Sequence, residues 1–183
     1  MSEYASDGAV EVPPLSGEGA VLAAVQRALA DRPGVLPATR AMSHFGEHAL
    51  GWVGIAAVGA LADPGRRKRW MGVAVGAVGA HAASIAIKRV VRRRRPSHPD
   101  IVINVGTPSK LSFPSSHATS TTAATILLGR LTGLPLAAVI VPPMLLSRLV
   151  LGVHYPTDVL AGAAVGAASA AAVGLAEEKL GWA

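Results

Sequence analysis

The stretch SRLVLGVHYPTD, residues 147–158, ends one long apolar run and begins another, so it marks a turn between two membrane-spanning helices. It holds Arg148 and Asp158, two of only three charged residues between Leu111 and Ala176. A charged side chain inside a bilayer costs about 2.5–3.5 kcal/mol on insertion scales. We therefore expect these two residues to be paired or functional, and His154 lies between them.

The distribution of apolar residues predicts an all-α membrane protein. Hydrophobic residues make up 51% of the 183 positions and gather in Ala-, Val-, Gly- and Leu-rich runs separated by short basic clusters. The net charge is +6, but the basic residues stand at the ends of apolar runs, where lipid head groups and topology explain them. This placement argues against nucleic-acid binding. The chain has no cysteine, which excludes disulfides and thiolate metal sites.

Hydropathy predicts a polytopic bundle of about five spanning helices. The expected spans are 49–62, 70–91, 117–131, 134–152 and 156–175. Two short helices at 20–30 and 35–47 are expected to lie in the membrane interface. Residues 1–19, with four acidic residues and no basic one, are expected to form a flexible tail, which leaves 20–183 as the membrane domain.

Alternation of the spans sorts the polar residues onto two membrane faces. One face receives 66–69, Arg130 and Lys179; the other receives 88–95, Lys110, His117, Arg148 and His154. Most of the residues whose side chains could bind an anion or take part in catalysis therefore lie on the second face. The non-catalytic basic residues are balanced between the faces, so the orientation of the site in the membrane stays open.

Three segments on that face have chemistry suited to an anion. In the first, Lys88 and Arg95 are seven residues apart and face the same side if the helix persists. For its other basic residues, Arg89, Arg92, Arg93 and Arg94, the alternative is a membrane-interface anchor.

In the second segment, Ser115, Ser116 and His117 precede an apolar helix. Free amides and the helix dipole at such a start favour a bound anion, and the alternative is an ordinary helix cap.

The third segment is the opening stretch. Pro156 suits the first position of a helix, which places His154 just before that helix and Asp158 in its first turn. The carboxylate then orients the imidazole and leaves its other nitrogen free to attack, while Arg148 offers a planar fork of donors for phosphate. The alternative is a buried Arg148–Asp158 ion pair with a bystander histidine.

Together the three segments resemble the signature of the type 2 phosphatidic acid phosphatase superfamily: Lys-x6-Arg-Pro, Pro-Ser-Gly-His and Ser-Arg-x5-His-x3-Asp. The first part is complete from Lys88 to Pro96 and the third from Ser147 to Asp158. The second reads Pro-Ser-Ser-His, with Ser116 where the family has glycine. The serine side chain either crowds the phosphate or adds a hydrogen-bond donor to it, and the backbone is strained if φ is positive at this position. We therefore expect the substitution to change the level of activity and not to abolish it.

The resemblance implies a phosphatase that needs no metal and no cofactor. In it His154 attacks phosphorus, Asp158 orients His154, and His117 protonates the leaving oxygen and then activates water. The phosphate oxygens are held by Lys88, Arg95, Ser115, Ser116 and Arg148.

The resemblance also implies a membrane lipid substrate and a multi-pass protein of the cell membrane. Within the superfamily, the chain resembles members that act on a polyprenyl-linked phosphate of cell-wall arabinan precursor synthesis. The resemblance lies in its small size, its composition rich in Ala, Val, Gly and Arg, and the sequence of residues 111–120. Undecaprenyl diphosphate, phosphatidylglycerophosphate and phosphatidic acid are the alternative substrates. The non-enzyme alternative is an inactive relative that binds phospholipid or acts as a scaffold. Oligomeric state is not indicated.

One further segment lies outside the signature. His44 and His48 are one helical turn apart, and with Glu47 they fit an inverted zinc-site pattern that lacks a third ligand. Metal binding is therefore not expected, and a substrate-facing role or a structural role in the interface both stay open. His81, seven residues before Lys88, is expected to pack within the bundle.

Overall fold

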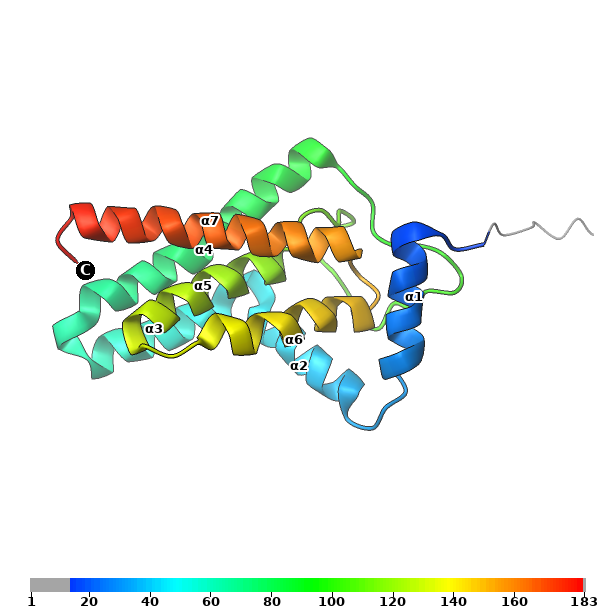
Figure 1. The fold of residues 1–183 in the computed structure, drawn as a ribbon, viewed down its shortest axis with the longest axis horizontal. Coiled ribbons are helices and arrows are strands. Elements are labelled where there is room, and N and C mark those ends of the chain that lie inside the picture. Colours follow the sequence, from blue (N-terminus) through cyan, green and yellow to red (C-terminus); the bar gives the residue numbers. More distant parts are fainter. Residues whose placement is uncertain (1–13, 183) are drawn as a thin grey trace, which may run out of the picture.

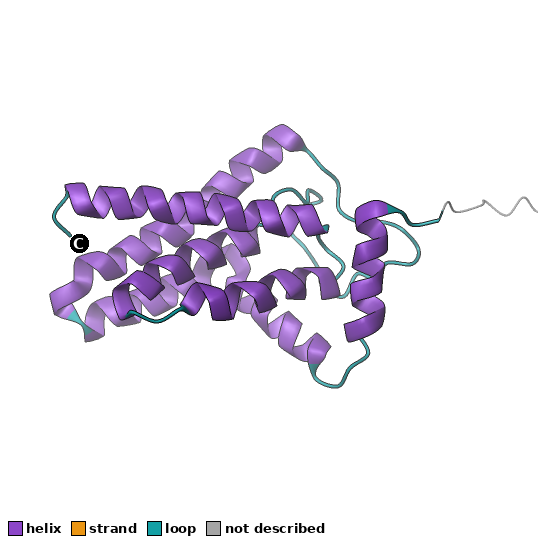
Figure 2. Cartoon of the chain, viewed as in Figure 1, coloured by secondary structure: helices purple, strands orange, loops and turns teal. Residues whose placement is uncertain are grey.

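The computed structural model describes residues 14–182, and within that range every regular element is a helix (Figure 2). The elements are α1 Gly17–Leu29, α2 Val35–Gly46, η1 Glu47–Ala49, α3 Leu50–Ala62, η2 Pro64–Arg66, α4 Arg67–Val91, α5 Ser116–Thr132, α6 Leu136–Val150 and α7 Pro156–Lys179. The all-α prediction is confirmed. An isolated bridge between Arg94 and Leu111 is the sole β-type pairing in the described range.

The helices form an elongated bundle that is closed at one end by α1 (Figure 1). Helices α4 to α7 run roughly along its long axis, whereas α1 lies across the end near the α4–α5 connection and the start of α7. The C-terminus lies at the opposite end. The end closed by α1 is therefore the face on which the three motifs were expected to meet.

Helix boundaries agree closely with the hydropathy, with one correction at the N-terminus. Helix α1 begins at Gly17, so Glu18 belongs to a helix and not to the expected tail. The rest of that tail up to residue 13 lies outside the described residues. Pro142 and Pro143 lie inside α6, which remains one helix.

Three helical segments of the described chain are long and apolar enough to cross a membrane: Val35–Ala62, Pro64–Val91 and Pro156–Lys179. The first joins α2, η1 and α3, and α6 is apolar but shorter. Helix α5 is rich in Ser and Thr and contacts α4, α6 and α7, so it has little surface to offer to lipid. This explains why the central helix of the bundle is less apolar than the helices around it.

Small residues and hydroxyls allow α5 to pack closely against its neighbours. Thr119 and Thr125 satisfy their hydroxyls by donating to the carbonyls of Ser115 (2.8 Å) and Thr121 (2.7 Å), one turn back. On α7, a Cβ added at Gly162 would lie 2.7 Å from the carbonyl oxygen of Ser115. Such backbone proximity is typical of helix packing in membranes and fixes the start of α5 against α7.

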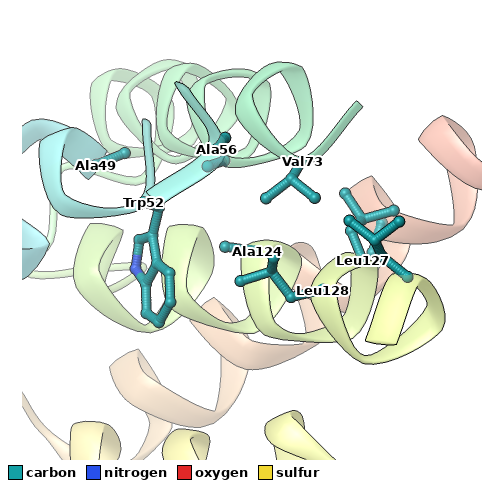
Figure 3. Packing of buried hydrophobic residues seen from close by; sticks show 10 residues of the cluster. Ala49, Trp52, Ala56, Val73, Ala124, Leu127 and Leu128 are labelled. Carbon is teal, nitrogen blue, oxygen red and sulfur yellow. The ribbon is translucent and has the colours of Figure 1, made fainter. Parts of the chain in front are cut away.

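The apolar core lies between α3, α4 and α5, away from α1 (Figures 1 and 3). Trp52, Val73 and Leu128 belong to this one cluster, and the indole of Trp52 donates to Thr121 Oγ1 at 3.2 Å. Large apolar side chains such as Leu61 and Val75 face outward, as expected for contact with lipid.

Candidate functional site

A cavity of about 540 Å³ opens where α4 ends and α5 and α7 begin, a size ordinary for a small-molecule site. Six of the eight predicted site residues line it: Lys88, Arg95, Ser116, His117, Arg148 and His154. Ser115 and Asp158 do not line the cavity, but both are fully buried, and Ser115 N donates to Asp158 O at 2.9 Å. The structure therefore brings the three motifs together.

The arginine run after α4 is extended and not helical. Helix α4 ends at Val91, and Arg92 has a left-handed φ of 54°. Side chains then alternate along the extended backbone: Arg92 and Arg94 are exposed, whereas Arg93 and Arg95 are partly buried. The helical explanation for why Lys88 and Arg95 converge was therefore wrong, and so was the anchor interpretation for Arg93.

Arg95 connects the long α4–α5 loop to the stretch before α7. Its Nε donates to Ser109 O at 2.8 Å and its Nη1 to Val153 O at 2.7 Å, and Nη1 is 3.2 Å from His154 Nε2. Burial lowers the pKa of Arg95 to about 10, against the opposing effect of the Asp158 carboxylate. The guanidinium therefore stays charged at neutral pH, beside the imidazole.

Lys88 holds the loop that leads into α5. Its buried ammonium donates to the carbonyl oxygens of Pro114 (2.5 Å), Ser112 (3.0 Å) and Leu111 (3.4 Å). These bonds fix the backbone just before the helix start and keep a positive charge at the cavity wall.

The serines at the start of α5 cap the helix and join it to α4. Ser115 is the N-cap, and its Oγ accepts from Ala118 N at 3.5 Å. Ser116 is the first residue of α5 and has no positive φ, so the strain considered for a residue replacing glycine is absent. Its hydroxyl lies 2.7 Å from Ser84 Oγ on α4.

Ser43 of α2 links two site residues, and no sequence pattern had indicated it. Its carbonyl oxygen lies 2.9 Å from His117 Nε2, and its Oγ accepts from Arg148 Nη1 at 2.8 Å. Because a carbonyl only accepts, Nε2 of His117 carries the proton in this arrangement. Arg148 is 1% exposed and its Nε has no partner among the described residues, so a donor remains for an anion.

His154 and Asp158 have the arrangement expected of a nucleophile and the group that orients it. His154 Nδ1 lies 3.5 Å from Asp158 Oδ2, while Nε2 faces Arg95, which is able only to donate. Burial, followed by the charges of Arg95, Arg148 and Lys88, holds the pKa of His154 well below its usual value. The imidazole is therefore neutral, with its lone pair on Nε2 and its proton on Nδ1. At 3.5 Å from Asp158 Oδ2, Nδ1 lies beside the carboxylate without yet making a hydrogen bond.

Asp158 is held by a different arginine from the one that the sequence suggested. Its Oδ2 accepts from Tyr155 N at 2.8 Å, and its Oδ1 accepts from Arg93 Nη1 at 3.1 Å. Arg148 makes no ion pair with it, so the alternative of a buried Arg148–Asp158 pair was wrong.

Arg93 also ties α1 to the start of α7. It donates to Thr157 Oγ1 at 2.7 Å and to the Glu18 carboxylate, and it stacks on the Tyr155 ring at 4.1 Å. The Glu18 carboxylate in turn accepts from Thr157 N at 3.2 Å. Burial raises the pKa of Glu18, but the bonds from Arg93 and Thr157 outweigh it and lower the pKa overall. Sequence reasoning missed this link because Glu18 was assigned to a tail.

Sequence comparison identifies the family and close relatives. A model of the PAP2 superfamily matches residues 69–182. The decaprenylphosphoryl-5-phosphoribose phosphatase of Mycolicibacterium smegmatis is 69% identical over 146 residues, covering 80% of this chain and 81% of the relative. The enzyme of the same name from Mycobacterium tuberculosis is 60% identical over 157 residues, covering 86% and 89%.

Two solved structures share the architecture. The transmembrane PAP2-type phosphatidylglycerolphosphate phosphatase of Bacillus subtilis superimposes with a TM-score of 0.68 at 25% identity, covering 87% of this chain and 86% of that one. LpxE of Aquifex aeolicus superimposes with a TM-score of 0.70 at 17% identity, covering 84% and 92%, which shows a shared fold.

Proposed function

The chain belongs to the PAP2 superfamily, and from that premise we propose that it is a metal-independent membrane phosphatase acting through a phosphohistidine on a polyprenyl-linked phosphoribose. The observation that carries the proposal is His154: a buried, neutral imidazole with Nδ1 toward Asp158 and Nε2 toward the cationic cavity. A nucleophile oriented by a third group is the arrangement required for covalent catalysis.

In the first step, Nε2 of His154 attacks phosphorus as the ester oxygen leaves with its electron pair. Asp158 stabilises the developing positive charge on the ring through Nδ1. His117, at the cavity wall, protonates the leaving oxygen, and the negative phosphate beside it favours the protonated imidazole. The products are a phosphohistidine and the free alcohol.

In the second step, water attacks the phosphohistidine and His117 accepts its proton. The N–P bond breaks, inorganic phosphate forms, and His154 is neutral again. His117 is suited to both steps because Ser43 O fixes its ring at 2.9 Å from Nε2. The same group thus acts as acid in one step and as base in the other.

The phosphate oxygens are stabilised by fixed donors that surround the cavity. Arg95, Lys88 and the free Nε of Arg148 supply positive charge, and the backbone amide of Ser116 stands at the N-terminus of α5. The amide of Ser115 already donates to Asp158 O, so it supports the helix start and not the phosphate. Donors preorganised toward developing charge are usually the largest single contribution to such catalysis.

The proposed substrate is decaprenylphosphoryl-5-phosphoribose, a precursor for cell-wall arabinan. Support comes from the two mycobacterial relatives, whose names carry that substrate and whose identities are 60–69% over most of the chain. The reaction would release the 5-phosphate and leave the decaprenyl phosphodiester intact. Phosphatidylglycerophosphate is the rival substrate, because the B. subtilis neighbour carries it in its name.

We further propose that the protein is a multi-pass protein of the plasma membrane with five spans, α3 to α7. The three long apolar segments support this, together with α6 and the enclosed α5. Residues 20–183 would form a single membrane domain in which α1 and α2 lie at the interface.

The test is phosphate release by the purified protein in detergent, with a chelator present. We expect hydrolysis of the lipid-linked 5-phosphoribose in preference to phosphatidylglycerophosphate, and complete loss in His154→Ala. His98→Ala serves as the matched control, because His98 lies in the α4–α5 loop and does not line the cavity. Full activity of His154→Ala would exclude the phosphohistidine mechanism.

A further inference from the structure

The cavity continues beyond the phosphate-binding residues to a second group of polar side chains. His44 of α2, Glu47 and His48 of η1, and His81 of α4 line it there, and none belongs to the three motifs. We call these four residues the histidine rim. His81 thus lines the cavity, although the sequence suggested simple packing in the bundle.

The backbone that carries the rim has an unfavourable conformation. His48 (φ 50°) and Ala49 (φ 61°) are consecutive non-glycine residues in the left-handed region, where the helical segment breaks between α2 and α3. L-residues adopt this region at a cost, so it persists where surrounding structure imposes it, and such positions cluster at functional sites. A continuous helix from α2 into α3 would not place these side chains as η1 does.

The rim is attached directly to the proposed catalytic residues. Gly46 lies against His117, since a Cβ added at Gly46 would be 2.7 Å from His117 Cδ2. One residue before His44, Ser43 bonds to both His117 and Arg148. Because His117 protonates the leaving oxygen in the proposed mechanism, the group attached to that oxygen must extend toward the rim.

The chemistry of the rim suits hydroxyl groups better than a second phosphate or an alkyl chain. His81 Nδ1 is buried and has no hydrogen-bond partner among the described residues, and its ring is 5.7 Å from that of His48. The Glu47 carboxylate, 4.0 Å from His44 Nδ1, would repel an anion and accept readily from a hydroxyl. An acyl chain would leave the buried His81 Nδ1 without a partner, whereas a hydroxyl could bond to it.

We propose that the histidine rim binds the hydroxyls of the sugar that bears the phosphate, and so selects a sugar phosphate over a glycerol phosphate. This inference rests on the proposed function, because it assumes that the phosphate-binding residues hold the reacting group. Thr107 and Ser109 of the α4–α5 loop line the same cavity and add polar groups there. Selectivity for the leaving group is thereby separated from the chemistry at phosphorus.

The experiment compares kcat/KM on two substrates, the lipid-linked 5-phosphoribose and phosphatidic acid, which has no free hydroxyl. The variants are Glu47→Gln, His81→Phe and His48→Asn, the last because asparagine tolerates a left-handed φ. We expect His81→Phe to lower the preference for the sugar substrate roughly tenfold, as for loss of a buried hydrogen-bond partner, and the variants of the exposed Glu47 and His48 to lower it less. Arg94→Gln, which is exposed and does not line the cavity, should leave the preference unchanged.

A matched substrate gives a second, independent measurement. For the parent protein, a 2-deoxyribose analogue should be a poorer substrate than the ribose compound. For the rim variant that has lost the contact to the 2-hydroxyl, the two compounds should be equally good substrates. Equal loss on both lipids in every variant, or no loss at all, would overturn the rim proposal while leaving the phosphatase proposal standing. If the parent protein hydrolyses phosphatidic acid but not the sugar substrate, both proposals fail.

Discussion

Two runs of four basic residues lie at the two ends of α4, and they bind different parts of the molecule. At its start, the cluster 66–69 donates mainly to main-chain carbonyls. The bonds are Arg66 Nη1 to Leu131 O (3.1 Å), Arg67 Nε to Ala60 O (3.2 Å) and Arg69 Nη2 to Arg130 O (2.9 Å). These acceptors lie in the last turns of α3 and α5, where carbonyls lack partners within the helix.

At the other end of α4, the cluster 92–95 divides by alternation. Arg93 and Arg95 reach Asp158 and His154, whereas Arg94 is exposed and makes no side-chain hydrogen bond or ion pair among residues 14–182. The two clusters have nearly the same composition, so residue type does not decide their roles. Backbone conformation decides them, because an extended segment aims alternate side chains into the cavity.

The largest effect should come from Arg95→Gln. It removes a charged donor beside the nucleophile, and loss of one such donor typically lowers turnover by about 10²–10³. Phosphate release in detergent measures the change, and Arg94→Gln is the control from the same cluster. If the two variants were equally active, the alternation argument would be wrong.

The same substitution should also move the pH dependence. The pKa of His154 is lowered, by burial first and then by the charge of Arg95. The reactive neutral imidazole therefore persists at pH values well below the usual pKa of histidine and becomes protonated only as the pH falls further. With Arg95→Gln that acid limb should shift upward, toward about 6.5. Profiles of kcat/KM against pH for parent and variant test this, since kcat/KM reports the free enzyme and the substrate's own titration is common to both. An unmoved or lower acid limb would contradict it.

Arg93→Gln should have a smaller effect, because Arg93 acts through Asp158. Losing the charged bond at 3.1 Å should lower kcat about 10- to 100-fold. This takes roughly 1.5–3 kcal/mol for such a bond as an upper bound, since Arg93 is partly exposed and Asp158 is buried. Glu18→Gln should weaken activity less, since Glu18 contacts Arg93 and not Asp158.

The double variant provides the control for this link. If Glu18 acts by holding Arg93, Arg93→Gln and Glu18→Gln combined should be no worse than Arg93→Gln alone. Strictly multiplicative losses would show that α1 supports the site by another route.

Much of this architecture follows from the sequence, and the exceptions have a common cause. Hydropathy predicted the helices, because contact with lipid and close helix packing impose a pattern of apolar and small residues on the sequence. The motif spacing predicted which residues meet at the cavity. It did not predict Ser43 or Glu18, because each acts through a backbone or carboxylate contact to a residue far along the chain. Nor did it predict the fate of Arg93, since a helix-to-extended change at Arg92 has no signature in a run of identical residues.

The smallest effect is expected in the other cluster, from Arg69→Ala. Its bond to Arg130 O is one hydrogen bond at the end of α5, worth about 0.5–1.5 kcal/mol, so the melting temperature in detergent should fall by only about 1–6 °C. Activity per folded molecule should be unchanged, because Arg69 lies at the end of α4 opposite the cavity. Arg95→Gln should differ by a large loss of activity per folded molecule, and its two carbonyl bonds predict at least as large a fall in melting temperature. If Arg69→Ala lowered kcat without lowering the melting temperature, the two ends of α4 would be coupled, and the division of roles between the clusters would not hold.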